Sequence, residues 1–507
     1  MAAPRAVPAK PPTAEYAVAI AACCASCVQG YNQGVYNGAL LFIRVELFPD
    51  DAAMEGLVTS MLLYGTVVGV LLSLSFLGRR RALMVASALL VVCGALFWWC
   101  PNTTVLLIAR FVAGFAAGIN TVNVPLFLAE CARPAVRGHV VSLAYTMLIV
   151  GILTSYAVNL VLSLTGSSDW RLMLGIVAIP AAVVLVVLQF LPESPRFLVL
   201  KGRIDEARAV LLRLRGDDQV AAVEEELASI IKATTKKDAS AAINDSDDSD
   251  DSDDQQPLLL PPPATSMPLD DEPDMALDWK QAGHTLLYDP TTRRALVVCV
   301  TLEFFQQFTG SQAVSFYTPT ILQDSGIETI FASLGLSDAS AALMASLIVY
   351  VIQLPFMVTG SHFIDAVGRR NMLLGTTPFL VMALVLLGVS YELSDTSAAG
   401  AWLAFGGLLL FKCTYSPGLG PIPQVIESEI FAPPVRSSGL TVAATFGSAF
   451  NIIILQAFPV MQQAMGDAVP FYIFAGLSVM AELFIFLCIP ETTMTVLEDA
   501  FRVFKRD

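Results

Sequence analysis

Several apolar stretches of the sequence contain amide side chains that could bind a solute. Gln306 and Gln307 are adjacent in one such stretch, and Gln353, Asn451 and Asn32 lie in three others. An amide both donates and accepts hydrogen bonds, so a group of amides suits a neutral, hydroxyl-rich solute. An unsatisfied polar group in hydrocarbon costs several kcal/mol. These amides therefore predict either a water-filled cavity or hydrogen bonds between helices.

Covalent chemistry is not indicated by the sequence. It shows no nucleophile paired with a base and no metal-binding cluster, so we expect neither an enzyme nor a bound metal or cofactor. Nine Cys residues without paired spacing are interpreted as small buried apolar side chains. The net charge is −15, but twelve acidic residues lie between positions 245 and 278, which leaves −3 for the remainder. No nucleic-acid partner is expected from that balance.

The elements that hold the amides are predicted to be membrane helices. The chain has 507 residues, of which 55% are hydrophobic and 14% charged, compared with about 25% charged in soluble proteins. A run of about 20 apolar residues crosses a bilayer as a helix. We therefore predict an all-α membrane protein with twelve transmembrane helices, some of them tilted or kinked. The spans lie near residues 16–43, 53–77, 82–100, 104–131, 139–164, 170–191, 295–322, 340–363, 371–391, 399–430, 437–464 and 469–488.

Two halves of the chain share an internal repeat of three motifs. Three motifs in one order at nearly one offset indicate two pseudo-symmetric six-helix bundles with a site between them. The repeated pairs are GRR at 78–80 and 368–370, ECARPAVR at 130–137 and EIFAPPVR at 429–436, and PE at 192–193 and 490–491. The predicted division is an N-terminus (1–15), a first bundle (16–191), a loop (192–294), a second bundle (295–488) and a tail (489–507).

Basic residues predict the orientation in the membrane. With both termini in the cytoplasm, 25 of the 29 Lys and Arg residues fall on the cytoplasmic side, as the positive-inside rule requires. We expect the plasma membrane, with an endosomal or vacuolar membrane as the alternative.

The loop between the two bundles is predicted to contain two kinds of segment. Residues 200–237 have the spacing of amphipathic helices, whereas 238–278 is rich in Ser and Asp and then in Pro, which predicts disorder. Asp254, Leu258 and Leu259 fit an acidic dileucine sorting signal in that disordered part. Coat adaptors are therefore expected partners, in addition to the lipid bilayer.

The motifs taken together resemble the sugar porter family of the major facilitator superfamily, in particular its facilitative glucose transporter-like members. The resemblance implies the major facilitator fold and alternating access without covalent chemistry. It also implies a hexose or a related sugar or polyol as the cargo. The motifs are GYNQGV at 30–35, RFVAG at 110–114, PESPR at 192–196, QQFTG at 306–310, DAVGRR at 365–370, GLGP at 418–421 and PET at 490–492.

The resemblance implies that polar residues of the second half bind the cargo. Gln306 and Gln307 stand at the sugar-contacting positions of the family's seventh helix. Gln312 and Gln353 stand where most members have Asn, and Asn451 matches a family Asn. Hydrogen bonding between helices is the alternative role of the paired Gln residues.

The aromatic positions of the family are only partly kept. Phe316 and Tyr317 are expected to form an outer gate. Gln424 stands where the family has Trp, and Tyr145 stands where Gln is common. The pocket is therefore predicted to have less surface for ring stacking, so a polyol or a larger glycoside is an alternative to a hexose.

The mode of transport depends on ionisable residues inside the spans. Proton-coupled relatives have Asp where this chain has Asn32, which cannot titrate, whereas the partner position keeps Arg110. Facilitative uniport is therefore expected. The alternatives are a proton-coupled symporter that uses Glu303 or Glu427, and a sugar sensor that does not transport. Lys412 also lies in an apolar span, without a recognisable partner.

Charged residues at the inner ends of the helices are expected to form a gate. In the family, such residues make salt bridges between the halves when the carrier opens outward, and these bridges break for the inward-open state. Anchoring at the membrane interface is their alternative role. Ser75 replaces an Asp of the family's first-half motif, so the first-half cluster is expected to be the weaker one. The set is Glu130, Arg137, Glu193, Arg196, Asp365, Arg369, Arg370, Glu429, Arg436 and Glu491.

Overall fold

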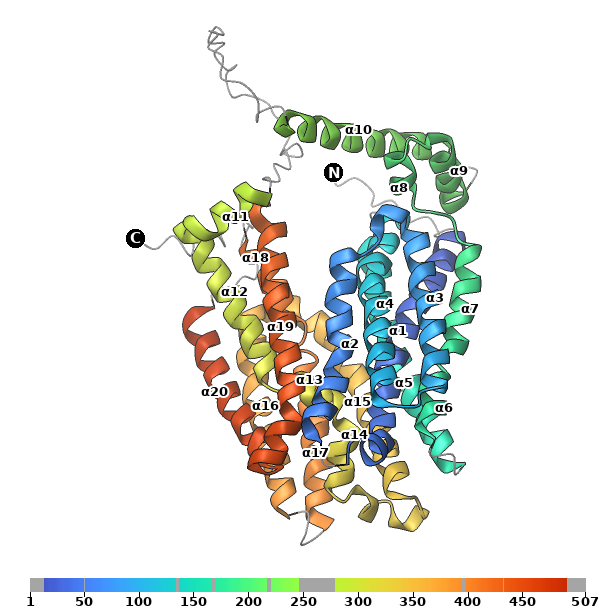
Figure 1. The fold of residues 1–507 in the computed structure, drawn as a ribbon. Coiled ribbons are helices and arrows are strands. Elements are labelled where there is room, and N and C mark those ends of the chain that lie inside the picture. Colours follow the sequence, from blue (N-terminus) through green and yellow to red (C-terminus); the bar gives the residue numbers. More distant parts are fainter. Residues whose placement is uncertain are drawn as a thin grey trace, which may run out of the picture.

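The structure, a computed structural model, describes residues 13–49, 51–133, 136–165, 169–216, 220–245, 279–393, 398–431 and 433–489. Within these ranges the chain forms helices and no strand, and three of the helices are single 3-10 turns, at Ser75–Leu77, Ile327–Thr329 and Ala332–Leu334. The helices form two bundles of six spans each (Figure 1). The fold is therefore the expected twelve-helix major facilitator fold.

The first bundle contains five continuous spans and a sixth span made of two helices. Side-chain caps begin several of them, because the first backbone N–H groups of a helix lack a partner. Asp51, for example, accepts a hydrogen bond from the backbone N of Met54 at 3.0 Å. The helices are α1 (Thr13–Leu47), α2 (Ala52–Leu72), α3 (Arg79–Trp98), α4 (Thr103–Cys131), α5 (Arg137–Leu164), α6 (Trp170–Gly175) and α7 (Ala178–Gln189).

The second bundle contains two broken spans where the sequence predicted continuous ones. Its seventh span divides into α12, α13 and α14, and its tenth into α17 and α18. The helices are α12 (Pro290–Phe308), α13 (Ser311–Phe316), α14 (Thr318–Asp324), α15 (Asp338–Val367), α16 (Arg369–Leu393), α17 (Ala398–Tyr415), α18 (Ile422–Ile430), α19 (Pro433–Met465) and α20 (Val469–Cys488).

Glycine and proline explain the two breaks. Gly310, between α12 and α13, has a φ of +78°, and a Cβ there would lie 2.3 Å from the ring of Phe474. A residue with a side chain would therefore be both strained and obstructed. Between α17 and α18, the segment 416–421 contains two Gly and two Pro residues, which interrupt the helical hydrogen bonds.

Ten of the described spans are long and apolar enough to cross a membrane, with α6 and α7 together counted as one span. The other two spans are α1, which buries the polar side chains of Asn32 and Asn37, and the broken seventh span. Broken helices are tolerated at membrane depth where other groups satisfy the freed backbone.

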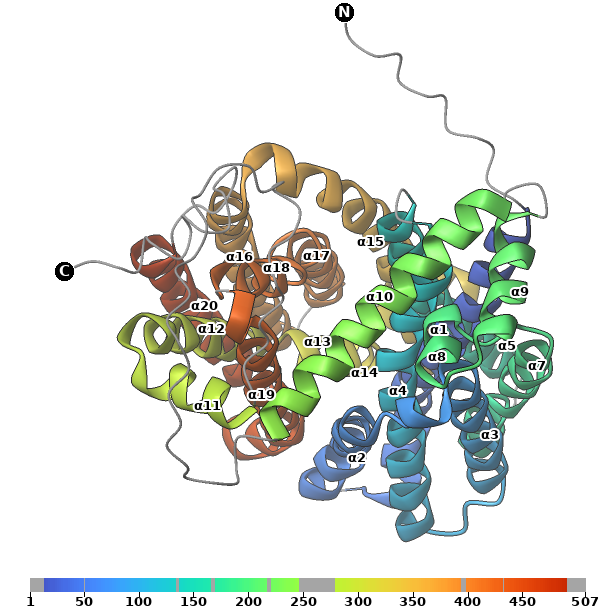
Figure 2. The same cartoon turned by 90° about the horizontal axis from the view of Figure 1, so that it is seen from above.

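Four further helices lie at one end of the two bundles, which we call the loop end; the opposite end is the far end. They are α8 (Pro195–Leu200), α9 (Ile204–Arg215), α10 (Val220–Asp245) and α11 (Trp279–Tyr288). Helices α8 to α10 share a small apolar core that includes Leu211 and Leu227, and α10 extends over the loop end toward the second bundle (Figure 2). Helices α9 and α10 cover most of the stretch 200–237 that was predicted to form amphipathic helices.

The helix α10 also corrects the predicted limit of disorder. It continues through residues 238–245, because the run Ala239-Ser-Ala-Ala-Ile243 has good helix formers. Asp254, Leu258 and Leu259 lie outside the described residues.

The two bundles contact each other between the middle of the spans and the far end. Helix α2 packs along α19, and α5 packs along α15. Across the halves, Arg44 Nη2 lies 2.6 Å from Asp324 Oδ1, and the hydroxyls of Ser163 and Ser340 lie 2.7 Å apart. The ribbons separate toward the loop end (Figure 1).

Candidate functional site

The broken spans bring backbone and amide groups together in the second bundle. Gln306 Nε2 on α12 donates to the carbonyls of Leu419 at 2.9 Å and Gly420 at 2.8 Å, in the break before α18. Gln306 Oε1 accepts from Gln307 Nε2 at 3.2 Å. Gln306 therefore satisfies the carbonyls of the broken helix. This placement corresponds to the interhelical role that was the alternative to sugar contact.

Three buried amide oxygens in the second bundle have no hydrogen-bond partner within the described protein. They belong to Gln307 on α12, Gln353 on α15 and Asn451 on α19. The amide nitrogen of Gln353 donates to Ser416 Oγ at 2.7 Å. Buried polar atoms are almost always hydrogen-bonded. Acceptors without a partner on three helices therefore fit a ligand that offers several hydroxyl donors.

Two other predicted cargo residues are accessible, and Gln312 is half-buried. Gln424 on α18 is exposed, and Tyr145 on α5 is 60% exposed. The predicted outer-gate residues Phe316 and Tyr317 are instead buried, and the Tyr317 ring lies 5.2 Å from that of Phe458 on α19. Their burial agrees with the packed far end of the molecule.

The first bundle contains a buried arginine, Arg110, whose hydrogen bonds go to backbone carbonyls and not to the amide of Asn32 on α1. Arg110 on α4 donates to the carbonyls of Val58 at 3.3 Å and Thr59 at 3.0 Å, and its guanidinium lies 3.6 Å from the centre of the Tyr36 ring. Asn32 is buried, and its Nδ2 has no partner among the described residues. The arginine is thus held by backbone dipoles and a ring face.

Asn120 on α4 is a residue that the sequence reasoning missed. It is 1% exposed, and neither its Oδ1 nor its Nδ2 has a partner within the described protein. Its position among Ala, Gly and Ile residues of an apolar span was the available signal. The described first bundle therefore has buried amide atoms without a partner on four residues, Asn32, Asn37, Asn120 and Asn159.

The two carboxylic acids predicted for the coupling role meet in the second bundle. Glu303 on α12 and Glu427 on α18 are 5% and 3% exposed, and their carboxyl groups are in hydrogen-bonding contact. The sequence identified each of them as an ionisable group inside a span but could not show that they face each other.

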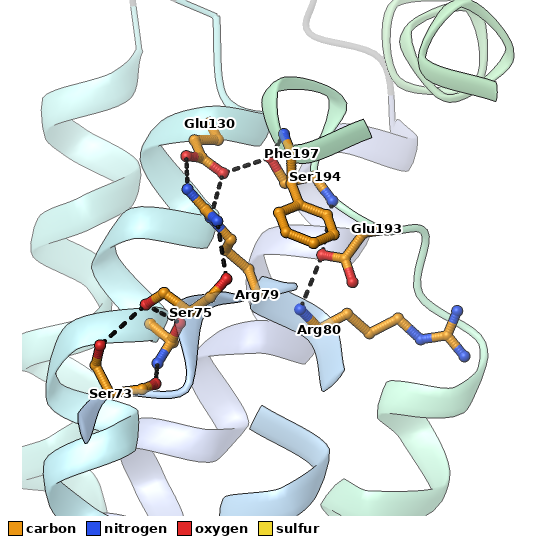
Figure 3. Close-up of polar contacts among 9 residues, drawn as sticks. Ser73, Ser75, Arg79, Arg80, Glu130, Glu193, Ser194 and Phe197 are labelled. Carbon is orange, nitrogen blue, oxygen red and sulfur yellow. Dashed lines mark hydrogen bonds and ion pairs between the residues drawn. The ribbon is translucent and has the colours of Figure 1, made fainter. Parts of the chain in front are cut away.

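The repeated motif makes the same contacts at the loop end of both bundles. In the first, Arg79 forms two hydrogen bonds with Glu130, at 3.0 and 3.1 Å, and Glu130 also accepts from Ser194 Oγ (Figure 3). In the second, Arg369 Nη2 lies 3.1 Å from Glu429 Oε1. The described ion pairs of this set are therefore made within each half.

The second arginine of each motif binds the end of the last span in its bundle. Arg80 donates to the carbonyls of Leu188 and Gln189 at the end of α7, at 3.0 and 2.9 Å. Arg370 donates to the carbonyl of Phe486 near the end of α20, at 2.7 Å. A cation at a helix C-terminus is favourable because the carbonyls there carry partial negative charge.

The remaining inner residues are placed as follows. Glu193 Oε1 accepts from the backbone N of Arg80 at 3.0 Å, Arg196 is exposed on α8, and Arg436 donates to the carbonyl of Phe431 at 3.3 Å. Arg137 and Asp365 lie in helices, but their side chains are outside the described set, and Glu491 lies outside the described residues.

Ser75 joins the first-half cluster through its backbone. Its carbonyl accepts from Arg79 Nη1 at 3.2 Å (Figure 3). Its hydroxyl donates to Asn123 Oδ1 at 3.2 Å. A serine in place of the family's aspartate therefore still holds Arg79. The expectation of a weaker first-half cluster stays a prediction.

The described residues contain no group of three His, Cys, Asp or Glu side chains that could bind a metal ion. The arrangement instead offers neutral amides, a closed far end and charged clusters at the loop end. Such a set can bind and release a polar solute between two bundles without making or breaking covalent bonds.

Comparison with known proteins gives consistent matches over nearly the whole chain. The family model "Sugar (and other) transporter" matches residues 18–252 and 265–504. Polyol transporter 5 of Arabidopsis thaliana is 29% identical over 98% of this chain and 88% of its own length. The galactose-proton symporter of Escherichia coli (strain K12) is 31% identical over 92% of this chain and 90% of its own length.

Solved structures show the same fold. The inward-open xylose transporter XylE from E. coli superposes with a TM-score of 0.73, at 21% identity, over 96% of this chain and 99% of its own. A partially occluded inward-open form of the same transporter gives a TM-score of 0.70, at 20% identity, over 94% of this chain and 100% of its own.

Proposed function

Because the chain belongs to the family of sugar (and other) transporters, we propose that it carries a sugar or polyol through a membrane. The two bundles alternate in exposing a shared site to either side. The cargo is bound by hydrogen bonds at the middle of the second bundle, and the loop-end clusters and the far-end contacts act as the two gates.

The observation that carries this proposal is the set of buried amide oxygens without partners. Gln307, Gln353 and Asn451 present them from three different helices. Each hydroxyl of a sugar or polyol can donate one hydrogen bond and accept others. With Gln424 in place of an aromatic residue, recognition depends more on hydrogen bonds than on ring stacking. This favours linear polyols, as well as rings, as cargo.

Facilitative uniport is the first candidate for the mode of transport. Asn32 cannot bind and release a proton, and Arg110 is held by backbone carbonyls and a Tyr ring. Proton symport is the second candidate, and a specific observation favours it: two buried carboxyl groups, of Glu303 and Glu427, are in contact.

The orientation follows the distribution of arginine. The paired arginines of both repeated motifs lie at the loop end, so this end faces the cytoplasm under the positive-inside rule. The plasma membrane is the proposed location. Recognition of Asp254, Leu258 and Leu259 by coat adaptors would move the carrier to endosomal or vacuolar membranes.

Uptake by purified protein in liposomes tests the cargo class. The panel contains D-glucose, D-galactose, D-xylose, D-sorbitol and D-mannitol, each with and without a pH gradient. Saturable uptake of at least one compound is expected. Equilibration without accumulation in either condition supports uniport, and accumulation driven by the pH gradient supports symport. Absence of uptake, together with saturable binding, would support a sensor and contradict the proposal.

A variant pair connects transport to the proposed site. Asn451→Leu removes one unpartnered acceptor, and we expect KM to rise roughly tenfold, as the loss of one hydrogen bond predicts. Gln462→Leu is the matched control, since it removes another half-buried amide eleven residues further along α19. An unchanged KM in Asn451→Leu would remove this residue from the site.

A further inference from the structure

The contact between Glu303 and Glu427 is built into the packing of three helices. The two carboxyl groups approach from α12 and α18. Gly447 on α19 lies directly against Glu303, because a Cβ at this position would be 2.1 Å from Glu303 Oε2. Any residue with a side chain at position 447 would displace the carboxyl group. Glu427 Oε1 is buried and has no hydrogen-bond partner within the described protein.

No described cation faces this pair. The other titratable groups that face it are Cys299 on α12 and Tyr415 on α17, both neutral at pH 7. On the same helix as Glu303, Arg294 lies nine residues earlier, roughly 14 Å along the axis.

The charged groups on the neighbouring helices are engaged elsewhere. On α18, Glu429 pairs with Arg369 of α16. Glu482 on α20 lies beside Thr377 of α16, and His284 on α11 stacks with Tyr288. On α19, Arg436 donates to the carbonyl of Phe431.

Electrostatics then fixes the charge of the pair. Two ionised carboxylates in contact repel each other, and burial strengthens the repulsion because little water screens it. Without a cation, the stable form holds one proton between the two groups, so that one carboxyl donates a hydrogen bond to the other. The pair then carries a single negative charge and titrates as a unit.

Gln307 connects the pair to the proposed cargo site. Its Nε2 lies 3.5 Å from Glu303 Oε2 and 3.2 Å from Gln306 Oε1, while its Oε1 is one of the acceptors without a partner. We propose that Glu303 and Glu427 form a proton-binding site whose shared proton holds Gln307 in the orientation that accepts cargo. This inference rests on the proposed cargo site.

The affinity for cargo should fall as pH rises. When the shared proton leaves at higher pH, the carboxylates separate, Glu303 no longer holds Gln307, and cargo affinity falls. Because one proton is involved, the Kd for cargo rises by at most about tenfold per pH unit. Linkage is reciprocal, so cargo binding also makes the pair hold its proton more tightly.

Binding measurements on the purified full-length carrier test this linkage. The probe is the compound of the sugar and polyol panel that is best transported, and its Kd is measured from pH 6 to pH 9 without a gradient. Glu427→Gln keeps a hydrogen-bond donor to Glu303 without a titrating proton, so this variant should bind cargo with a Kd that no longer changes with pH. Glu482→Gln removes another carboxyl group within the spans and should keep the wild-type pH profile.

Infrared spectroscopy gives a readout that does not need cargo. The wild type should show the C=O band of protonated carboxyl groups, which disappears as pH rises. The share of this band that comes from the pair should be missing from Glu427→Gln and Glu303→Gln, whereas other carboxyl groups such as Asp467 contribute equally to all of these proteins. Glu482→Gln should retain the share that comes from the pair. Thermal melting shows whether each variant is folded.

A wild-type Kd that is independent of pH, or a Glu427→Gln variant that keeps the pH dependence, would overturn the linkage. Absence of the pair's share of the infrared band from the wild type would overturn the proton site itself. Failure of every compound to bind at any pH, with that share present, would contradict the proposed cargo class and leave the proton site supported.

Discussion

The ammonium group of Lys412 lies 2.6 Å from the hydroxyl of Ser315, with the Tyr350 hydroxyl at 3.3 Å. Lys412 on α17 is 3% exposed, and its Nζ also lies 4.7 Å from the centre of the Tyr350 ring. Tyr350 stacks on Tyr156 of the other half, with ring centres 5.1 Å apart. The lysine without a recognisable partner is therefore held by hydroxyls and a ring face where the two bundles meet.

Replacement of this lysine by a neutral side chain of similar length should stabilise the carrier. Both hydroxyls already donate elsewhere, Ser315 to the carbonyl of Ser311 at 2.7 Å and Tyr350 to the carbonyl of Ser315 at 3.2 Å. Lys412→Met thus leaves no donor unsatisfied and removes a buried charge. We expect the free energy of unfolding to rise by roughly 1 to 3 kcal/mol, measured by thermal melting in detergent. A lower melting temperature would show that the ammonium contributes net stability.

Loss of the far-end ion pair should shift the carrier toward its outward-open state. Arg44 and Asp324 join the two halves at 2.6 Å, with side chains 26% and 31% exposed. A partly exposed pair contributes less than about 1 kcal/mol, so Asp324→Asn should change the ratio of the two states by less than about fivefold. Labelling of a cysteine introduced in the far-end half of the site, in liposomes, measures the change. Unchanged labelling would mean that the pair does not contribute to this seal.

Asp467, in the connection between α19 and α20, should give stability a pH dependence. Partial desolvation and the nearby Asp324 carboxylate raise the pKa of Asp467 above its usual value, against the opposing effect of Arg44. The folded state therefore holds this proton more tightly than the unfolded state, so the stability contribution is present at low pH and is lost as pH rises through the raised pKa. Asp467→Asn should melt at a higher temperature than the wild type at pH 7.

The same two proteins provide the control for Asp467. Below pH of about 3, the aspartate is mostly neutral in both folded and unfolded states, so the difference between the melting temperatures should largely disappear. A difference that stays constant across this pH range would assign the effect to packing instead of charge.

Mutations of Arg79 and Glu130 should have strongly non-additive effects on the free energy of unfolding. Their side chains are only 12% and 7% exposed, and the guanidinium makes two hydrogen bonds to the carboxylate. Either single change to Gln leaves a partly buried charge unpaired. We expect Arg79→Gln and Glu130→Gln together to cost less than the sum of the two, with a coupling energy of roughly 1 to 2 kcal/mol, from denaturation of all four proteins. Additive effects would contradict this contact.

The repeated loop-end motifs could be predicted from the sequence and gave the same contacts in both bundles. Arg79 and Arg369 both pair with the glutamate that begins the second repeated motif, Glu130 and Glu429. Because both repeats adopt the same fold, equivalent residues occupy equivalent positions in the two halves. The number of spans was also predictable, because the length and apolarity of a membrane helix are properties of a continuous stretch of chain.

Only the tertiary structure decided which buried polar groups meet. Gln306 donates to the carbonyls of the broken tenth span, Lys412 donates to the Ser315 hydroxyl, and the Glu303 carboxyl group contacts that of Glu427. Each of these contacts joins residues about 100 or more positions apart, and each depends on how far the helices are rotated and shifted along their axes. Hydrophobic pattern fixes which stretches enter the membrane. It leaves rotation and shift to side-chain packing between helices that are distant in the sequence.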